Sequence, residues 1–202
     1  MMRKNICDIF SDVEIVRHTP DLILKAQIPD KIFKDVKGWI KPCRNIKDSE
    51  YGELLNHRNI GTGHNSYQIS IPRKFIDNSL FLGYLIHFGQ LYLKKTSIPV
   101  KNIDRSIHLK NYPGHFDGYD IWMNFTSKGD DNPEHDHTGT LSGIIYIKDK
   151  DKHPTNFPTI GYTHIPNEGE ILLFPSHLRH SVGVKTTTSE RITASFNLVC
   201  FM

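Results

Sequence analysis

Cysteine, long apolar runs and net charge are all scarce in this chain, and each scarcity excludes a class of protein. Only three cysteines occur, Cys7, Cys43 and Cys200, and no two of them form a CxxC pair. A zinc ribbon or a redox dithiol is therefore not expected, and the three thiols are predicted to be reduced, as in a reducing cytosol. No apolar stretch reaches the roughly 18 residues that a membrane-spanning helix needs.

The N-terminus and the overall charge add two further limits. The chain starts with a basic segment, but Asp8, Asp12 and Glu14 interrupt any apolar region of a secretory signal. We therefore predict a cytoplasmic protein with no membrane partner. The formal net charge is +3, so nucleic acid is not indicated as a partner, because such binding depends on clustered rather than total charge.

The length and composition predict one soluble globular domain over residues 1–202. Hydrophobic residues make up 38% of the chain and charged residues 23%, which is typical of a folded protein. A chain of 202 residues is long enough for one substantial core, and a second full domain is not expected. Histidine is abundant, with 12 residues, and the functional question is which few of them converge.

Residues 1–118 predict a mixture of strands, helices and loops. Short strands are expected at 13–16 and 22–28, followed by a helix that Pro29 and Asp30 open and Pro42 ends. Residues 44–70 are polar and rich in Asn and Gly, so loops are expected there. A long helix with a broad apolar face is predicted over about 74–95.

Residues 119–202 change in character and predict an antiparallel β structure. The expected strands are short, rich in branched and aromatic residues and separated by turn residues; they cover 119–125, 141–148, 159–164, 170–174, 181–184 and 191–201. Strands at this spacing without intervening helices indicate a closed or double-sheet architecture, so the fold class is mainly β (α+β). The alternating charges of 148–152 predict a solvated loop, and His153 and His164 are expected to be solvated as well.

Two histidines stand two residues apart just before the strand at 141–148. Residues i and i+2 of an extended strand point to the same side, so His135 and His137 could present two imidazoles to one ion while Asp136 points away. His180 follows 43 residues after His137, and Arg191 follows 11 residues after His180. A paired-histidine strand, a distant third histidine and an arginine on a later strand together predict the site of a metal oxygenase. Such enzymes hold iron on one face and leave the other open for substrate and oxygen.

The last 85 or so residues resemble the 2-oxoglutarate/Fe(II)-dependent dioxygenases, and most closely a group of bacterial and phage enzymes distantly related to prolyl hydroxylases. The matching pieces occur in the family order: Trp122–Asn124, Gly129–Asp130, His135–His137, Leu141–Tyr146, Glu168–Gly169, Phe174–Ser176, His180–Val182 and Arg191–Asn197. The resemblance implies a double-stranded β-helix (jelly roll, cupin-like) core over 119–202, with the N-terminal elements of 1–118 packed on it. If the chain is encoded by a phage, the host cytoplasm is the expected location.

The resemblance also implies roles for single residues. His135 and His180 match the first and the distal iron ligands, and His137 falls where most of the superfamily has an aspartate. Arg191 matches the arginine that pairs with the distal carboxylate of 2-oxoglutarate, since its planar fork suits a carboxylate. Further contacts to this cosubstrate, or in one case to the substrate, are implied for Thr193, Tyr146 and Asn124.

The histidine at position 137 leaves three alternatives open. His135, His137 and His180 could form a three-histidine iron centre. A local bulge could instead bring Asp136 to the metal in place of His137, because bulges re-aim side chains beside active sites. In the third alternative the site has lost its iron and is vestigial or binds another metal.

The resemblance implies an Fe(II)- and 2-oxoglutarate-dependent hydroxylase that uses O2 and releases succinate and CO2. Halogenation is disfavoured because it needs the coordination position that His137 would fill. The sequence does not fix the substrate, which could be a protein or peptide, a nucleobase or a small metabolite, nor the oligomeric state. Two other classes stay open, a cupin-like metal-binding protein and a catalytically silent phage or bacterial module. Arg191 distinguishes the first, because a simple cupin has no need of a buried arginine there.

Overall fold

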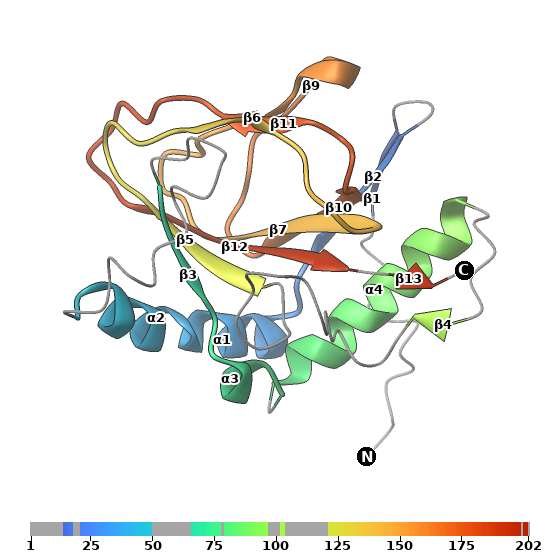
Figure 1. Cartoon of the computed structure of the whole chain (residues 1–202), viewed down its shortest axis with the longest axis horizontal. Coiled ribbons are helices and arrows are strands. Elements are labelled where there is room, and N and C mark those ends of the chain that lie inside the picture. Colours follow the sequence, from blue (N-terminus) through green and yellow to red (C-terminus); the bar gives the residue numbers. More distant parts are fainter. Residues whose placement is uncertain are drawn as a thin grey trace.

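The computed structural model describes residues 14–17, 21–49, 66–77, 79–96, 102–103, 121–198 and 200–201. Within these ranges the chain forms one large and one small antiparallel sheet, a short strand pair and helices (Figure 1). The prediction of a mainly β protein with two antiparallel sheets is confirmed. None of the described helices is both long and apolar enough to cross a membrane.

The large sheet has seven strands in the order β1-β2-β10-β7-β12-β5-β3. Its strands are β1 (Glu14–Arg17), β2 (Leu22–Gln27), β3 (Tyr67–Ser70), β5 (Ile121–Thr126), β7 (Leu141–Lys148), β10 (Glu170–Pro175) and β12 (Arg191–Leu198). The small sheet has the order β6-β11-β8-β9. It consists of β6 (Asn132–His135), β8 (Thr155–Phe157), β9 (Tyr162–His164) and β11 (His180–Val182). Strands β4 (Asn102–Ile103) and β13 (Cys200–Phe201) pair separately.

The helices lie on the side of the large sheet that faces away from β6 and β11 (Figure 1). They are α1 (Asp30–Gly38), α2 (Ile40–Lys47), α3 (Arg73–Asp77) and α4 (Leu80–Thr96), with a short 3-10 turn, η2 (Pro158–Ile160), before β9. The large sheet is thus covered on one face by helices, and the small sheet packs against its other face.

Two hydrophobic clusters fill these two layers. Ile145 and Ile147 of β7 belong to the larger cluster, together with Phe33 and other residues of the helices. Ile144 and Tyr146 point the other way and belong to the smaller cluster, with residues of β8 and β10. Strand β7 is therefore buried on both faces, which explains why its sequence is a continuous apolar run instead of an alternating one.

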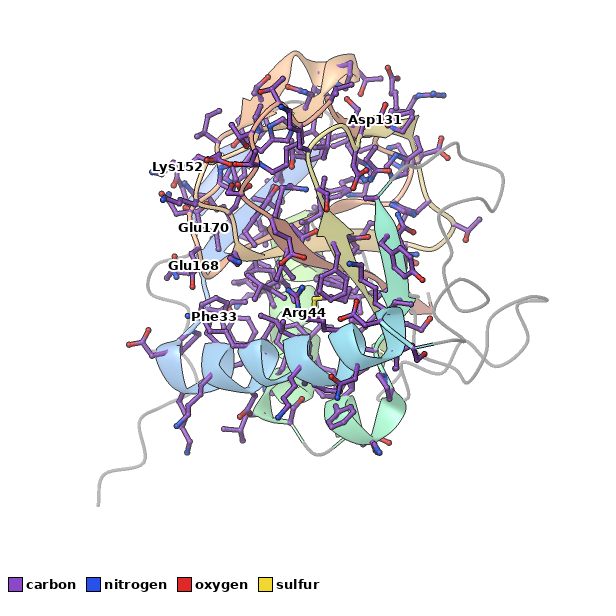
Figure 2. The ribbon with its side chains drawn as sticks, turned by 90° about the vertical axis from the view of Figure 1, so that its left-hand side faces the viewer. Phe33, Arg44, Asp131, Lys152, Glu168 and Glu170 are labelled. Atoms are coloured by element: carbon purple, nitrogen blue, oxygen red, sulfur yellow. The ribbon has the colours of Figure 1, made fainter. Side chains whose placement is uncertain are left out.

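An ion pair joins the helical layer to the residue directly before β12. Arg44 of α2 donates to both carboxylate oxygens of Glu190, at 3.1 and 2.6 Å, and its guanidinium lies 5.2 Å from the centre of the Phe125 ring. Figure 2 shows that Arg44 lies on the side of its helix that faces the sheet. Phe33 of α1 lies on the same side and belongs to the larger hydrophobic cluster. Glu190 directly precedes Arg191, so this contact fixes the chain where β12 begins.

Several predicted boundaries were wrong for local reasons. The predicted helix from Asp30 to Pro42 is two helices, since α1 ends at Gly38 and α2 begins at Ile40. Pro42 lies in the first turn of α2, where no backbone N–H is needed for a helical hydrogen bond. The loop predicted at 44–70 contains the end of α2 and strand β3, whereas 50–65 lie outside the described residues. The long helix at 74–95 is divided into α3 and α4, and Asp35 of α1 accepts the backbone N–H of Leu80 at 3.1 Å where α4 begins.

Candidate metal and cosubstrate site

Three imidazoles meet on the small sheet. His135, the last residue of β6, pairs directly across the strands with His180, the first residue of β11. His137 follows β6, and its backbone N–H donates to the carbonyl of Ser176 at 2.9 Å. One nitrogen of each ring lies within 4.8 Å of the others, a grouping that could hold a metal ion. Asp136, which lies between the two histidines, is exposed and is not part of this group.

Backbone carbonyls determine which nitrogen of two of these rings carries the lone pair. Nδ1 of His135 lies 2.7 Å from the carbonyl oxygen of Pro133, and Nδ1 of His180 lies 3.1 Å from that of Leu178. A carbonyl only accepts, so Nδ1 is the protonated nitrogen and Nε2 holds the lone pair. Burial also lowers the pKa of His135, so its neutral form, which is the form that binds a metal, is favoured.

A cavity opens between the two sheets beside the histidines. Its lining comes from β3, β5, β6, β7, β11 and β12: Ser66, Gln68, Trp122, Asn124, Thr126, Asn132, His135, His137, Ile144, His180, Val182, Arg191, Thr193 and Ser195. Alternation along two paired strands produces much of this lining, because Arg191, Thr193 and Ser195 stand opposite Thr126, Asn124 and Trp122. Among these lining residues, Arg191 alone carries a permanent charge.

Arg191 is buried yet only partly used by the protein. The residue is 3% exposed. Its Nε donates to Oδ2 of Asp149 at 3.0 Å, and its Nη2 donates to Oγ1 of Thr155 at 3.3 Å. A guanidinium has five N–H donors, so three N–H groups have no partner among the described residues, two on Nη1 and one on Nη2. Arg191 lines the cavity, so an anion there could accept from these N–H groups.

Asn124 adds a second polar group without a full set of partners. Its Nδ2 donates to Thr193 Oγ1 at 3.1 Å and to Ser195 Oγ at 2.9 Å, whereas its buried Oδ1 has no partner within the described structure. Hydroxyls both donate and accept, so the amide can also turn over, with Oδ1 accepting from the two hydroxyls and Nδ2 facing the cavity. In that orientation Asn124 would present an N–H donor to the cavity.

Tyr146 is not among the residues that line the cavity, whereas Trp122 is. The hydroxyl of Tyr146 donates to Thr155 Oγ1 at 2.9 Å. Its ring lies beside Arg191, whose Cζ is 5.6 Å from the ring centre. Trp122 is half-buried and lines the cavity, and its ring centre lies 5.6 Å from that of His137.

The expectation of solvation was wrong for His164 and for Asp149, although the other residues of the charge alternation at 148–152 are exposed as expected. His164 is only 3% exposed, and its Nε2 lies 3.0 Å from Glu170 Oε2. Burial lowers the pKa of His164, so the neutral ring donates to the carboxylate and the contact is a hydrogen bond instead of an ion pair. Within the charge alternation of 148–152, Asp149 is buried beside Arg191, and Asp151 pairs with the fully buried Lys185 at 2.7 Å.

The donor set fits a ferrous ion and a 2-oxo acid. Three imidazoles on one side of a cavity leave the opposite side of a metal open, and imidazole suits iron. Arg191, Thr193 and Asn124 lie on the large sheet across the same cavity. One layer therefore presents groups for a cation and the other presents groups for a carboxylate, while the roles assigned to these residues from sequence stay predictions.

Comparisons with known proteins find a family match over part of the chain and solved structures of similar fold. Residues 149–197 match the family described as "Putative 2OG-Fe(II) oxygenase". None of the curated proteins matches the chain. Among solved structures, a prolyl-4-hydroxylase of Pseudomonas putida is 14% identical, with a TM-score of 0.57, and the match covers 87% of this chain and 92% of that one.

A second solved structure is more distant. The viral collagen prolyl hydroxylase of Paramecium Bursaria Chlorella virus-1, as its 2OG complex, is 15% identical with a TM-score of 0.47; the match covers 86% of this chain and 93% of the other. The likeness to the Pseudomonas protein shows a shared fold, and the match over 149–197 includes the strand that carries Arg191. The resemblance of this chain to the 2-oxoglutarate/Fe(II)-dependent oxygenases, with prolyl hydroxylases as structural neighbours, is thereby confirmed.

Proposed function

We propose that this protein is an Fe(II)- and 2-oxoglutarate-dependent dioxygenase built on a double-stranded β-helix. The observation that carries the proposal is the coincidence of two groups at one cavity: three clustered imidazoles and a buried arginine with three N–H groups left for a ligand. His135, His137 and His180 would hold the iron. The two facing antiparallel sheets and the likeness to the Pseudomonas prolyl-4-hydroxylase support the double-stranded β-helix.

Each residue of the proposed site has a defined task. Arg191 would bind the distal carboxylate of 2-oxoglutarate through the N–H groups that neither Asp149 nor Thr155 uses. Thr193 and Asn124 would donate to the carboxylates from the same sheet. Bound iron would supply the oxidation chemistry with O2 as oxidant: one oxygen atom of O2 would enter succinate as 2-oxoglutarate loses CO2, and the other would enter the hydroxylated substrate.

The proposed reaction is hydroxylation, with a protein, a peptide or a small molecule as substrate. A third histidine would occupy the coordination position that a halide would need, which disfavours halogenation. Trp122 lies beside His137 and lines the cavity, so it presents an aromatic surface to a substrate near the proposed metal. The likeness to prolyl hydroxylases rests on fold and gives only a weak preference for a peptide.

Anaerobic titration with Fe(II), followed by 2-oxoglutarate, tests the proposal. The wild-type protein should develop the weak visible charge-transfer band of an iron-bound 2-oxo acid. His180→Ala should abolish the band by removing an iron ligand. Arg191→Lys should retain iron binding but require at least ~10-fold more 2-oxoglutarate, because an ammonium cannot reproduce the planar fork.

The outcomes separate this proposal from its alternatives. Binding of iron or zinc without any response to 2-oxoglutarate would favour a cupin-like metal protein and remove the role given to Arg191. Failure of the anaerobically prepared protein to bind any divalent metal would favour a catalytically silent module.

A further inference from the structure

The buried partner of Arg191 lies in a segment whose sequence suggested a solvated loop. Asp149 follows directly after β7, and its side chain is 1% exposed. Besides Arg191, its carboxylate accepts the backbone N–H of His153, with both oxygens at 3.1 Å. The carboxylate is therefore held by the turn that follows it, and it has a fixed direction from which to hold the guanidinium.

Asp149 and Thr155 together occupy one edge of the guanidinium. Asp149 accepts a hydrogen bond from Nε, and Thr155 accepts one from Nη2. The hydroxyl of Thr155 is itself fixed, because it also accepts from Tyr146 at 2.9 Å. With two atoms of the planar group restrained in this way, its rotation is stopped, and Nη1 with the remaining N–H of Nη2 forms the edge left for a ligand.

We propose that Asp149 is a positioning residue that aims Arg191 at the distal carboxylate of the 2-oxo acid. This inference rests on the proposed function, and it assigns a role to a residue that touches neither the iron nor the cosubstrate. The orientation of the planar guanidinium matters, since two parallel N–H···O bonds to a carboxylate form only in one orientation. Preorganisation by a buried neighbour removes the cost of ordering the guanidinium when the ligand binds.

A purely electrostatic role for Asp149 makes the opposite prediction. Asp149 places a negative charge next to the cation that would bind an anionic ligand, and like charges repel. If charge balance were its only effect, removal of Asp149 would strengthen binding of 2-oxoglutarate. If Asp149 instead acts by orienting Arg191, its removal would weaken binding of 2-oxoglutarate even though the repulsion is lost.

Two ligands that differ only in the distal carboxylate isolate the effect. 2-Oxoglutarate and 2-oxopentanoate have the same carbon chain and the same metal-chelating end, and only the former can use Arg191. Their affinities for the anaerobic, metal-loaded protein would be measured by isothermal titration calorimetry, after metal binding by each variant has been checked separately. The variants are Asp149→Ala and the isosteric Asp149→Asn, which can still accept from Nε.

Asp151→Asn is the matched control in the same loop. Asp151 accepts from Lys185, Thr187 and Ser189 and has no contact with Arg191 among the described residues. A general loosening of the loop would therefore affect the control and the test variants alike.

Asp149→Ala should weaken 2-oxoglutarate binding about 10- to 100-fold, the value of one charge-assisted hydrogen bond. Asp149→Asn should show a smaller loss, Asp151→Asn none, and 2-oxopentanoate should bind all four proteins alike. Should Asp149→Ala fail to fold, the isosteric variant decides alone. Unchanged or tighter 2-oxoglutarate binding, or an equal loss for both ligands or in Asp151→Asn, would overturn the positioning role. If the wild type does not distinguish the two ligands, the proposed function fails at Arg191, which is a different result.

Discussion

Replacing Gly143 by alanine should destabilise the protein through a steric conflict between two strands of the large sheet. Gly143 of β7 stands opposite Phe196 of β12, and the Phe196 ring is fully buried. A Cβ atom at position 143 would lie 2.1 Å from Phe196 Cζ and 2.6 Å from the backbone oxygen of Leu172. Carbon atoms in contact prefer at least about 3.5 Å, so the ring would have to move by about 1.4 Å.

The loss of stability depends on whether the Phe196 ring can move away from the added methyl group. Phe196 is enclosed by the larger hydrophobic cluster, and the backbone oxygen of Leu172 belongs to β10, which pairs with β7. Neither atom can therefore move without a substantial cost in folding free energy. Overpacking of a core costs about 1–3 kcal/mol, and the backbone contact places Gly143→Ala near the upper end, at about 3 kcal/mol. For a chain of this length that corresponds to a fall of about 6–12 °C in Tm.

Thermal unfolding followed by circular dichroism measures the shift, and Gly83→Ala supplies the control. Gly83 is exposed within α4, and a Cβ there would meet nothing within 4 Å. The same chemical change should therefore stabilise the helix by about 0.5–1 kcal/mol, because alanine loses less backbone entropy on folding. A fall of less than ~2 °C for Gly143→Ala, against that control, would refute the steric argument.

Three further predictions concern single buried or site residues. Burial holds the pKa of His164 below its ordinary value of 6.5, so the unfolded chain takes up this proton first. Stability should be fully present above pH 6.5 and fall as the pH decreases toward the folded pKa, and His164→Gln should reduce that loss in denaturation curves at pH 5–7. Asp136→Asn should leave the metal affinity measured by calorimetry unchanged. His137→Ala should lower that affinity about 100-fold, because loss of one ligand costs about 3 kcal/mol of binding free energy. If Asp136→Asn lowered the affinity and His137→Ala did not, Asp136 would be the ligand. Burial raises the pKa of the fully buried Cys43 thiol to about 12, so with the other two cysteines replaced by serine, a thiol reagent should react only as fast as the protein unfolds.

Strands with strong local signals could be predicted from the sequence. The bounds of β7 match the prediction, because its run of branched and aromatic residues is both long and flanked by turn residues. Strand β6 was expected only at its histidine, and β8 was missed, for the opposite reason. Strand β6 has the sequence Asn-Pro-Glu-His, which contains proline and no branched residue, and β8 is only three residues long. Both strands exist because they pair with β11, which local sequence does not encode.

The candidate site was predictable in its spacing and not in its supporting contacts. The i, i+2 spacing of His135 and His137 and the later strand of Arg191 identified side chains that the structure brings to one cavity. Asp149 was missed because its partner lies 42 residues away, and alternating charges are ordinarily solvated. An aspartate directly after a strong apolar strand, rather than the charge pattern, was the signal that could have pointed to it.

The division of the site between two sheets has a consequence for how the metal would enter and leave. The three histidines belong to β6, β11 and the segment after β6, in the sheet of short strands, whereas the helices and the larger hydrophobic cluster support the other sheet. Short strands with few partners open locally more often than a packed core unfolds. Metal exchange can then proceed while the large sheet stays closed. Once both metal and 2-oxo acid are bound, they link the two sheets, and amide hydrogen exchange in β6 and β11 should slow far more than in β7.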